Sequence, residues 1–138
     1  MMGSVLAWAV DHHLDTELRL AVSLARWWEL RGRLADRTPL LREVARRAEP
    51  GSDGWRALQF WIGWALVRSA DLAGAMEHCA AVVDVIGDRE PSRALADCLN
   101  IRSVALSNLG QDPEAAACAR RALAMARELA TRSVRCSP

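Results

Sequence analysis

The sequence contains no lysine and no tyrosine, and it has a single phenylalanine. All 18 of its basic residues are arginine, and 17 acidic residues leave a formal net charge of only +1. A chain so close to neutral lacks the electrostatic field that binding to bulk nucleic acid or to an acidic membrane requires. We therefore expect no membrane association and no direct nucleic-acid contact. Arginine in place of lysine is typical of a GC-rich bacterial genome.

Long hydrophobic runs are missing as well. The run LQFWIGWALV covers only ten residues, 58–67, and is followed by Arg68. A membrane span needs roughly 20 apolar residues. The first 13 residues carry no basic region before their short apolar run, which is not the pattern of a secretory signal. We therefore expect a cytoplasmic protein. We also expect one domain, because 138 residues are enough to form one hydrophobic core.

The common patterns of catalytic and metal sites are also absent. The sequence has no G-x-S-x-G, no H-E-x-x-H and no Walker-type phosphate loop. Four cysteines stand at positions 79, 98, 118 and 136, outside any C-x-x-C pair. We interpret them as reduced thiols, three of which lie in alanine-rich helical surroundings and act as small buried hydrophobes. His12 and His13 are adjacent, so on a helix they diverge by about 100° and cannot chelate one ion well. We predict no catalytic residue, no metal site, no cofactor and no enzymatic activity.

Apolar residues recur at helical spacing, and alternating strand patterns are almost absent. The sequence predicts an all-α protein of about seven antiparallel helices. They cover approximately residues 2–12, 15–32, 35–48, 54–69, 71–87, 92–109 and 113–130. Asp15 and Asp71 are the expected starts of the second and fifth helices, and Pro39 fits the first turn of the third. Residues 131–138 are expected to form a frayed tail.

Three turns occupy equivalent places in this helix pattern. Gly32, Ala70 and Gly110 each stand between two helices, at separations of 38 and 40 residues. The spacing indicates a helix–turn–helix unit repeated three times after one extra helix, which is the pattern of an α-solenoid. The predicted division is an N-terminal helix at 1–14, repeats at 15–50, 51–90 and 91–130, and a tail at 131–138.

The third unit carries the clearest family resemblance. Its segment LSNLGQDPEAAACARRALAMAREL resembles the second half of a tetratricopeptide repeat. The matching features are a small residue at the turn, Gly110, an alanine early in the second helix, Ala115, and an alanine–leucine pair, Ala122 and Leu123.

The first two units resemble the same family less completely. In the second unit, Ile62, Gly63 and Leu66 resemble the signature of the first helix, and Ala75 stands at the small position of the second helix. The first unit has Leu24, Ala25 and Trp28 in the corresponding places. It departs from the pattern at Arg37, where a small residue is expected.

A long, alanine- and arginine-rich array of this kind resembles the C-terminal repeat region of large bacterial transcriptional regulators that carry a signal-transducing NTPase domain. The resemblance implies a module that binds a protein or a peptide. It also implies that the first helix of each unit lines a concave groove. In this sequence the corresponding residues are Arg19, Val22, Arg26, Phe60, Trp64, Val67, Arg68, Asn100, Val104 and Asn108. The same register places Glu29 and Leu30 on the groove side.

Two alternatives remain open for this groove. A partner segment could dock on Phe60 and Trp64, with Arg19, Arg26 and Arg68 orienting its acidic groups. An apolar small-molecule effector could instead lie between the same aromatic rings and change the shape of the array. In either case the groove is free only if the N-terminal helix, through Trp8, does not cover the two rings.

Two further surfaces have open interpretations. Six arginines lie between Arg31 and Arg47, beside Trp27 and Trp28; the pattern fits a solvated face next to a core tryptophan, or a phosphate-binding surface. The last helix has a broad apolar stripe that includes Ala115 and Leu129. A terminal repeat helix needs a polar outer face or a partner, so the stripe could meet further repeats or a second copy of the chain in a homodimer.

Overall fold

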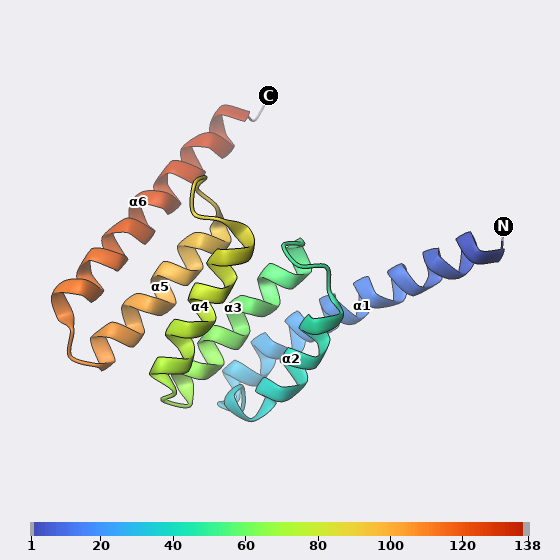
Figure 1. The fold of residues 1–138 in the computed structure, drawn as a ribbon, viewed down its shortest axis with the longest axis horizontal. Coiled ribbons are helices and arrows are strands. Elements are labelled where there is room, and N and C mark those ends of the chain that lie inside the picture. Colours follow the sequence, from blue (N-terminus) through green and yellow to red (C-terminus); the bar gives the residue numbers. More distant parts are fainter. Residues whose placement is uncertain (1, 137–138) are drawn as a thin grey trace. The chain divides into compact units, whose positions relative to one another are not determined.

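The computed structural model describes the backbone of residues 2–136 and the side chains of residues 13–135. Over these residues all regular structure is helical and no strand occurs, which confirms the all-α prediction (Figure 1). The elements are α1 (Met2–Leu30), the 3-10 helix η1 (Ala35–Arg37), α2 (Thr38–Arg47), α3 (Asp53–Arg68), α4 (Leu72–Ile86), α5 (Arg93–Asn108) and α6 (Asp112–Cys136). Among the described residues, none of the helices combines the length and the apolar composition of a membrane span.

The first two predicted helices, 2–12 and 15–32, are one continuous helix, α1. Asp15 does not start a helix; its carboxylate pairs with the Arg19 guanidinium one turn later, at 3.3 Å. The sequence has no proline or glycine between Gly3 and Gly32. An aspartate within a helix costs only about 0.7 kcal/mol relative to alanine, which is too little to break it. The described chain therefore has six α-helices where the sequence pattern predicted seven.

The predicted tail is also helical, because α6 continues to Cys136. The Arg132 guanidinium lies 2.9 Å from the Glu128 carboxylate one turn earlier. The Thr131 hydroxyl donates to the Arg127 carbonyl at 3.0 Å. No glycine or proline interrupts the sequence between Pro113 and Pro138. The polar composition of this segment suggested a frayed end, but its residues are compatible with helix and nothing in it ends one.

The starts of the other helices follow local signals. Asp71 caps α4, since its carboxylate accepts the amide of Gly74 at 3.0 Å. Ser92 caps α5 in the same way by accepting the amide of Leu95 at 3.1 Å. Pro39 lies in the first turn of α2, where its missing amide proton costs no helix hydrogen bond.

The three predicted turns share one backbone conformation. Gly32, Ala70 and Gly110 all have positive φ angles, of 70°, 63° and 80°. At each turn this residue donates its amide to the carbonyl three residues earlier, and the next residue donates to the carbonyl five residues earlier. This pair of hydrogen bonds is the Schellman motif that ends a helix on a left-handed residue. The repeated motif gives the three turns a common register.

Ala70 is the non-glycine residue with a positive φ among the described residues. The left-handed conformation costs an L-residue about 1–2 kcal/mol, and glycine avoids this cost. We expect Ala70→Gly to raise the free energy of unfolding by about 0.5–1 kcal/mol in urea titration, because the greater chain entropy of glycine offsets part of the gain. Ala73→Gly is the matched control on an exposed helical site of α4, where the same change should cost about 1 kcal/mol. Destabilisation by Ala70→Gly would contradict this assignment.

The chain divides into two compact units, Met1–Ala65 and Leu66–Pro138. In the first unit, α2 packs on α1. The first turn of α3 also approaches α1 closely, since a Cβ atom at Gly54 would lie 3.1 Å from Cδ1 of Leu18. Ala25, Leu41 and Leu58 contribute fully buried side chains, one from each helix.

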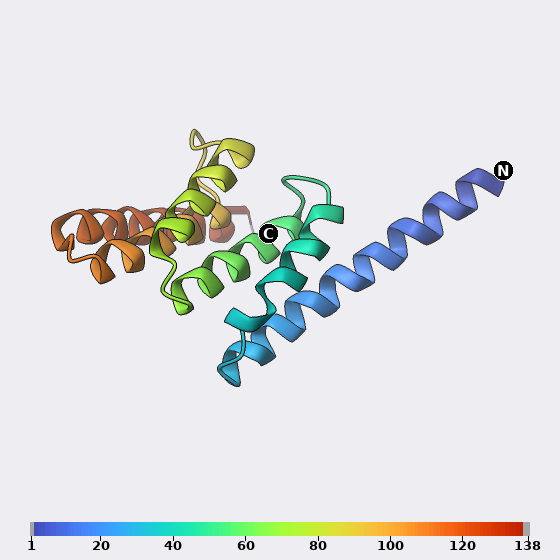
Figure 2. The same ribbon diagram turned by 60° about the horizontal axis from the view of Figure 1, so that its bottom comes forward.

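In the second unit, α5 packs against both α4 and α6 (Figures 1 and 2). Ile101 and Ala105 of α5 are buried in its core together with Val82 of α4. The Ser103 hydroxyl donates to the carbonyl of Ala115 at 2.8 Å and links α5 to α6.

Small residues recur at fixed distances along the sequence from the three turn residues. Seven residues before the three turn residues stand Ala25, Gly63 and Ser103, of which the first two are buried. Five residues after the second and third turn residues stand Ala75 and Ala115, both buried. In the first repeat, the residue five positions after the turn residue Gly32 is the exposed Arg37, which lies in the 3-10 turn before α2. The departure that the sequence indicated at Arg37 is therefore also a departure in backbone structure.

Candidate functional site

The surface shared by α1 and α3 carries a polar link between two residues predicted to face the groove. The indole Nε1 of Trp64 donates to Oε1 of Glu29 at 3.0 Å. Both side chains are half-buried. A hydrogen bond to a charged acceptor is worth about 1.5–3 kcal/mol at best, and less where water competes. The bond fixes the orientation of the Trp64 ring and links α3 to α1, the first helices of two successive predicted repeats.

Phe60 lies one turn before Trp64 on α3 and is also half-buried. Its ring meets that of Trp61 edge to face, with centroids 5.0 Å apart and planes at 69°. This geometry is one of the two that aromatic pairs prefer. The sequence analysis assigned Phe60 to the groove, and the contact with Trp61 supports its ring. Trp8 lies outside the residues whose side chains are described.

The remaining predicted groove residues of the first unit are polar or partly covered. Val22 is half-buried, whereas Arg19 and Arg26 are exposed. The side chains of the Arg19–Asp15 ion pair are 81% and 60% exposed. Exposed pairs of this kind contribute little to stability, so Arg19 can exchange its partner for an acidic group at small cost.

The predicted groove residues of the compact unit Leu66–Pro138 differ in burial. Arg68, Asn100 and Asn108 are exposed, and Val104 is half-buried. Val67 is only 9% exposed, so it contributes to the core rather than to a surface that a ligand could touch. Asp97, which precedes these positions on α5, has its pKa raised by burial, while Arg93 acts in the opposite direction.

The arginine-rich segment between Arg31 and Arg47 is largely engaged within the first unit. Arg31 lies 4.9 Å from the ring centroid of Trp27, and Arg37 lies 5.4 Å from that of Trp28. Arg46 pairs with Glu43, and Arg47 pairs with Glu17 of α1. Trp28 is 8% exposed and Trp27 49% exposed. Four of the six arginines thus contact side chains of the first compact unit.

Two cavities were not anticipated from the sequence. A small one, of about 150 Å³, lies between α1 and α2 of the first unit and is bordered by the exposed side chains of Leu20 and Leu40. A larger one, of about 450 Å³, lies between α4 and α5 of the second unit and includes Cys79 and Cys98 in its wall. Both thiols are free and buried, as expected for small apolar residues. Since no motif joins two cysteines 19 positions apart, only the packing of the helices could reveal the pair.

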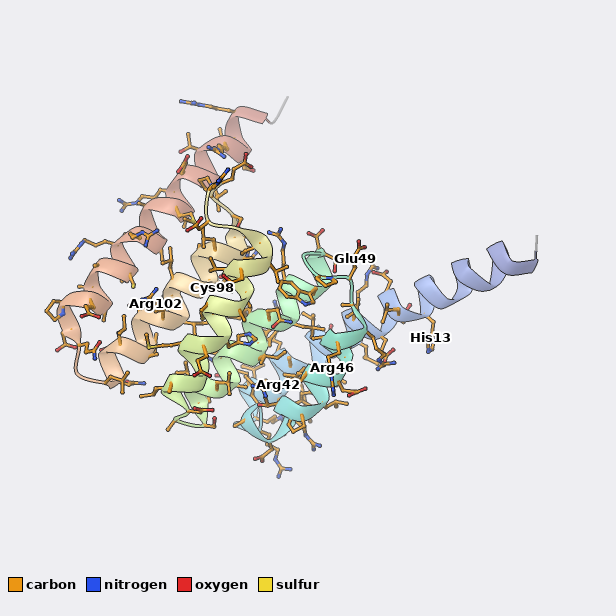
Figure 3. All side chains as sticks on the ribbon, viewed as in Figure 1. His13, Arg42, Arg46, Glu49, Cys98 and Arg102 are labelled. Carbon is orange, nitrogen blue, oxygen red and sulfur yellow. The ribbon has the colours of Figure 1, made fainter. Side chains whose placement is uncertain are left out.

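Histidine and carboxylate side chains do not gather into a metal site in the part of the chain with described side chains. No group of three or more His, Cys, Asp or Glu residues is placed there to hold a metal ion. His13 is exposed on α1 (Figure 3). His12, its predicted neighbour, lies outside the residues whose side chains are described.

Comparison with known proteins gives no match: no family model fits the sequence, and no curated protein or solved structure is significantly similar to it.

Proposed function

We propose that this chain is a tetratricopeptide-like helical-repeat module that binds a protein or peptide segment on the aromatic surface of α1 and α3. The repeated Schellman turns support this proposal, since they recur at the separations of 38 and 40 residues. The buried small residues in register with these turns support it as well. A solenoid requires such small residues where neighbouring helices approach closely.

The observation that carries the proposal is the contact between α1 and α3. These are first helices of successive units, and the hydrogen bond between Trp64 and Glu29 joins their groove-side residues. Adjacent first helices are the arrangement from which a concave surface of this kind is built. Phe60 and Trp64 keep part of their ring surface exposed there, and partly exposed aromatic residues are frequent hot spots of protein interfaces.

The mechanism is non-covalent. An extended segment or a helix packs apolar side chains on Phe60 and Trp64, while Arg19, Arg26 and Arg68 attract its acidic groups. The Trp61 contact and the Glu29 hydrogen bond hold the two rings before the partner arrives. Such preorganisation lowers the entropy lost on binding. The context that we propose is the regulatory repeat region of a bacterial transcriptional regulator, in the cytoplasm.

The second candidate function is the sensing of a small molecule. The cavity between α4 and α5, about 450 Å³ in volume, favours it because ligand pockets usually measure about 300–1,000 Å³. In this alternative the effector would alter the packing of α4 on α5, and no peptide would be required.

Tryptophan fluorescence of the full chain distinguishes the two functions. Peptides selected from a random display library on the immobilised chain should shift the emission of the wild type, because the partner covers the Trp64 ring. They should shift that of a Trp64→Phe variant less, while a fractionated pool of small metabolites leaves both spectra unchanged. A library that yields no binder, together with a spectral response to a metabolite fraction, would replace the peptide-binding proposal by the sensor.

A further inference from the structure

Three sulfur-containing residues line the larger cavity. Met76 and Cys79 come from α4, and Cys98 comes from α5. Met76 and Cys79 are three residues apart, so they share one face of their helix. Cys98 lies on α5 beside α4, and Arg102 follows it one turn later (Figure 3). The cavity therefore collects the soft donor atoms of two helices at one place.

The two cysteines form a hydrogen-bonded pair. Cys79 is 4% exposed and Cys98 is 7% exposed, and neither is in a disulfide. The hydrogen bond from the Cys79 thiol lowers the pKa of Cys98 and raises that of Cys79. Both cysteines border the cavity between α4 and α5, and Arg102 belongs to the same wall. A thiolate is the form of cysteine that binds metals.

The donor set selects the type of ion. Zinc in a structural site takes four ligands, and no group of three or more His, Cys, Asp or Glu occurs over the described side chains. Hard cations such as Mg²⁺ and Ca²⁺ require oxygen ligands. Two thiols and one thioether instead match the preference of soft Cu(I). We propose that Met76, Cys79 and Cys98 form a binding site for Cu(I) between α4 and α5.

Binding at this site involves no change of oxidation state. Cu(I) displaces the thiol protons of Cys79 and Cys98, which pass to the solvent, and each sulfur forms a bond to the metal. The resulting dithiolate complex carries one negative charge, which the guanidinium of Arg102 offsets. The thioether of Met76 is neutral and completes a three-sulfur set. Since all three residues line the cavity of about 450 Å³, an ion inside the cavity reaches them within the folded unit.

A disulfide is the competing chemistry of such a pair. It would bring the sulfurs to about 2.05 Å. A metal about 2.3 Å from each sulfur, the length of a zinc–thiolate bond, bridges a wider gap. A pair of free, buried thiols can therefore bind a metal without the closer approach that a disulfide needs.

The test uses the reduced full chain without oxygen, with Cu(I) supplied as its complex with a chromophoric chelator. The wild type should withdraw one equivalent of Cu(I). Cys79→Ser and Cys98→Ser should each weaken binding by at least about 100-fold, because each removes a direct ligand. Loss of a residue that only supports a ligand typically weakens metal binding by about 10- to 100-fold. Met76→Leu should weaken it by about tenfold. The matched control is the double variant Cys118→Ser, Cys136→Ser, which should retain the affinity of the wild type.

X-ray absorption at the copper edge of the wild-type complex gives a second readout that does not depend on variants. It should show sulfur ligands only. Unchanged binding by Cys98→Ser, loss of binding in the Cys118→Ser, Cys136→Ser control, or nitrogen and oxygen ligands at the copper would each overturn the proposal. Formation of a Cys79–Cys98 disulfide with peroxide, without any withdrawal of Cu(I) by the reduced chain, would also overturn it.

Discussion

Replacing Ile62 by alanine is expected to lower the free energy of unfolding by about 2–5 kcal/mol, the range for large-to-small changes in a packed core. Ile62 is one of the largest fully buried side chains, with 1% of its surface exposed. It lies on α3 next to Gly63, at the packing position that the repeat pattern assigned to it. Removal of three carbon atoms there leaves a cavity that the surrounding helices cannot fill without moving. Urea or thermal unfolding followed by circular dichroism measures the effect.

The matched control for Ile62→Ala is Leu30→Ala. Leu30 is 80% exposed at the end of α1, so its truncation should change the free energy of unfolding by less than about 0.5 kcal/mol. If Ile62→Ala and Leu30→Ala lower the free energy of unfolding equally, the face of α3 that includes Ile62 is not packed in the core.

A second large loss of stability is expected at Ala75 and Ala115, which stand five positions after the turn residues Ala70 and Gly110. Ala75 is fully buried and Ala115 is 5% exposed. Leucine at either position should destabilise the second unit by about 1–3 kcal/mol, because the added carbons have no space and force the helices apart. The measurement is again equilibrium unfolding, with each variant compared with the wild type at the same protein concentration.

Arg37→Leu provides the contrast within the same register. Arg37 occupies the equivalent place in the first unit but is exposed, so leucine there should change the free energy of unfolding by less than about 0.5 kcal/mol beyond the loss of its contact with the Trp28 ring. Strong destabilisation by Arg37→Leu, or none by Ala75→Leu, would contradict the register derived from the turns.

Local signals made much of the fold predictable. Glycine, proline and capping residues act within a few positions of themselves, so Gly110, Asp71 and Pro39 located helix ends correctly. Polar residues misled the prediction at Asp15 and at residues 131–136. There a polar residue or segment was read as an end of helix, although its side chains only pair with neighbours one turn away. Polar residues on a helix surface look alike whether the helix continues or stops.

The candidate site was less accessible to sequence reasoning. Periodicity placed Phe60 and Trp64 on one face of α3, but the partner of the Trp64 indole depends on how α3 crosses α1, which no local pattern encodes. Val67 shares that predicted face and is nevertheless buried. Cys79 and Cys98 were separately recognised as buried hydrophobes. Their pairing depends on the rotation of α4 and α5 about their own axes, which only the packed structure specifies.

The central claim is that the partly exposed rings of Phe60 and Trp64 bind a partner segment. Its most direct test is calorimetric measurement of the dissociation constant of one library-selected peptide for the wild type, for the double variant Phe60→Ala, Trp64→Ala, and for Trp27→Ala. Trp27 is the control because it is an exposed aromatic residue outside the predicted groove. We expect the dissociation constant to increase at least about 30-fold for the double variant, corresponding to the roughly 2 kcal/mol of an interface hot spot, and to change less than about twofold for Trp27→Ala. An unchanged dissociation constant for a double variant that retains its helical circular dichroism would contradict the claim.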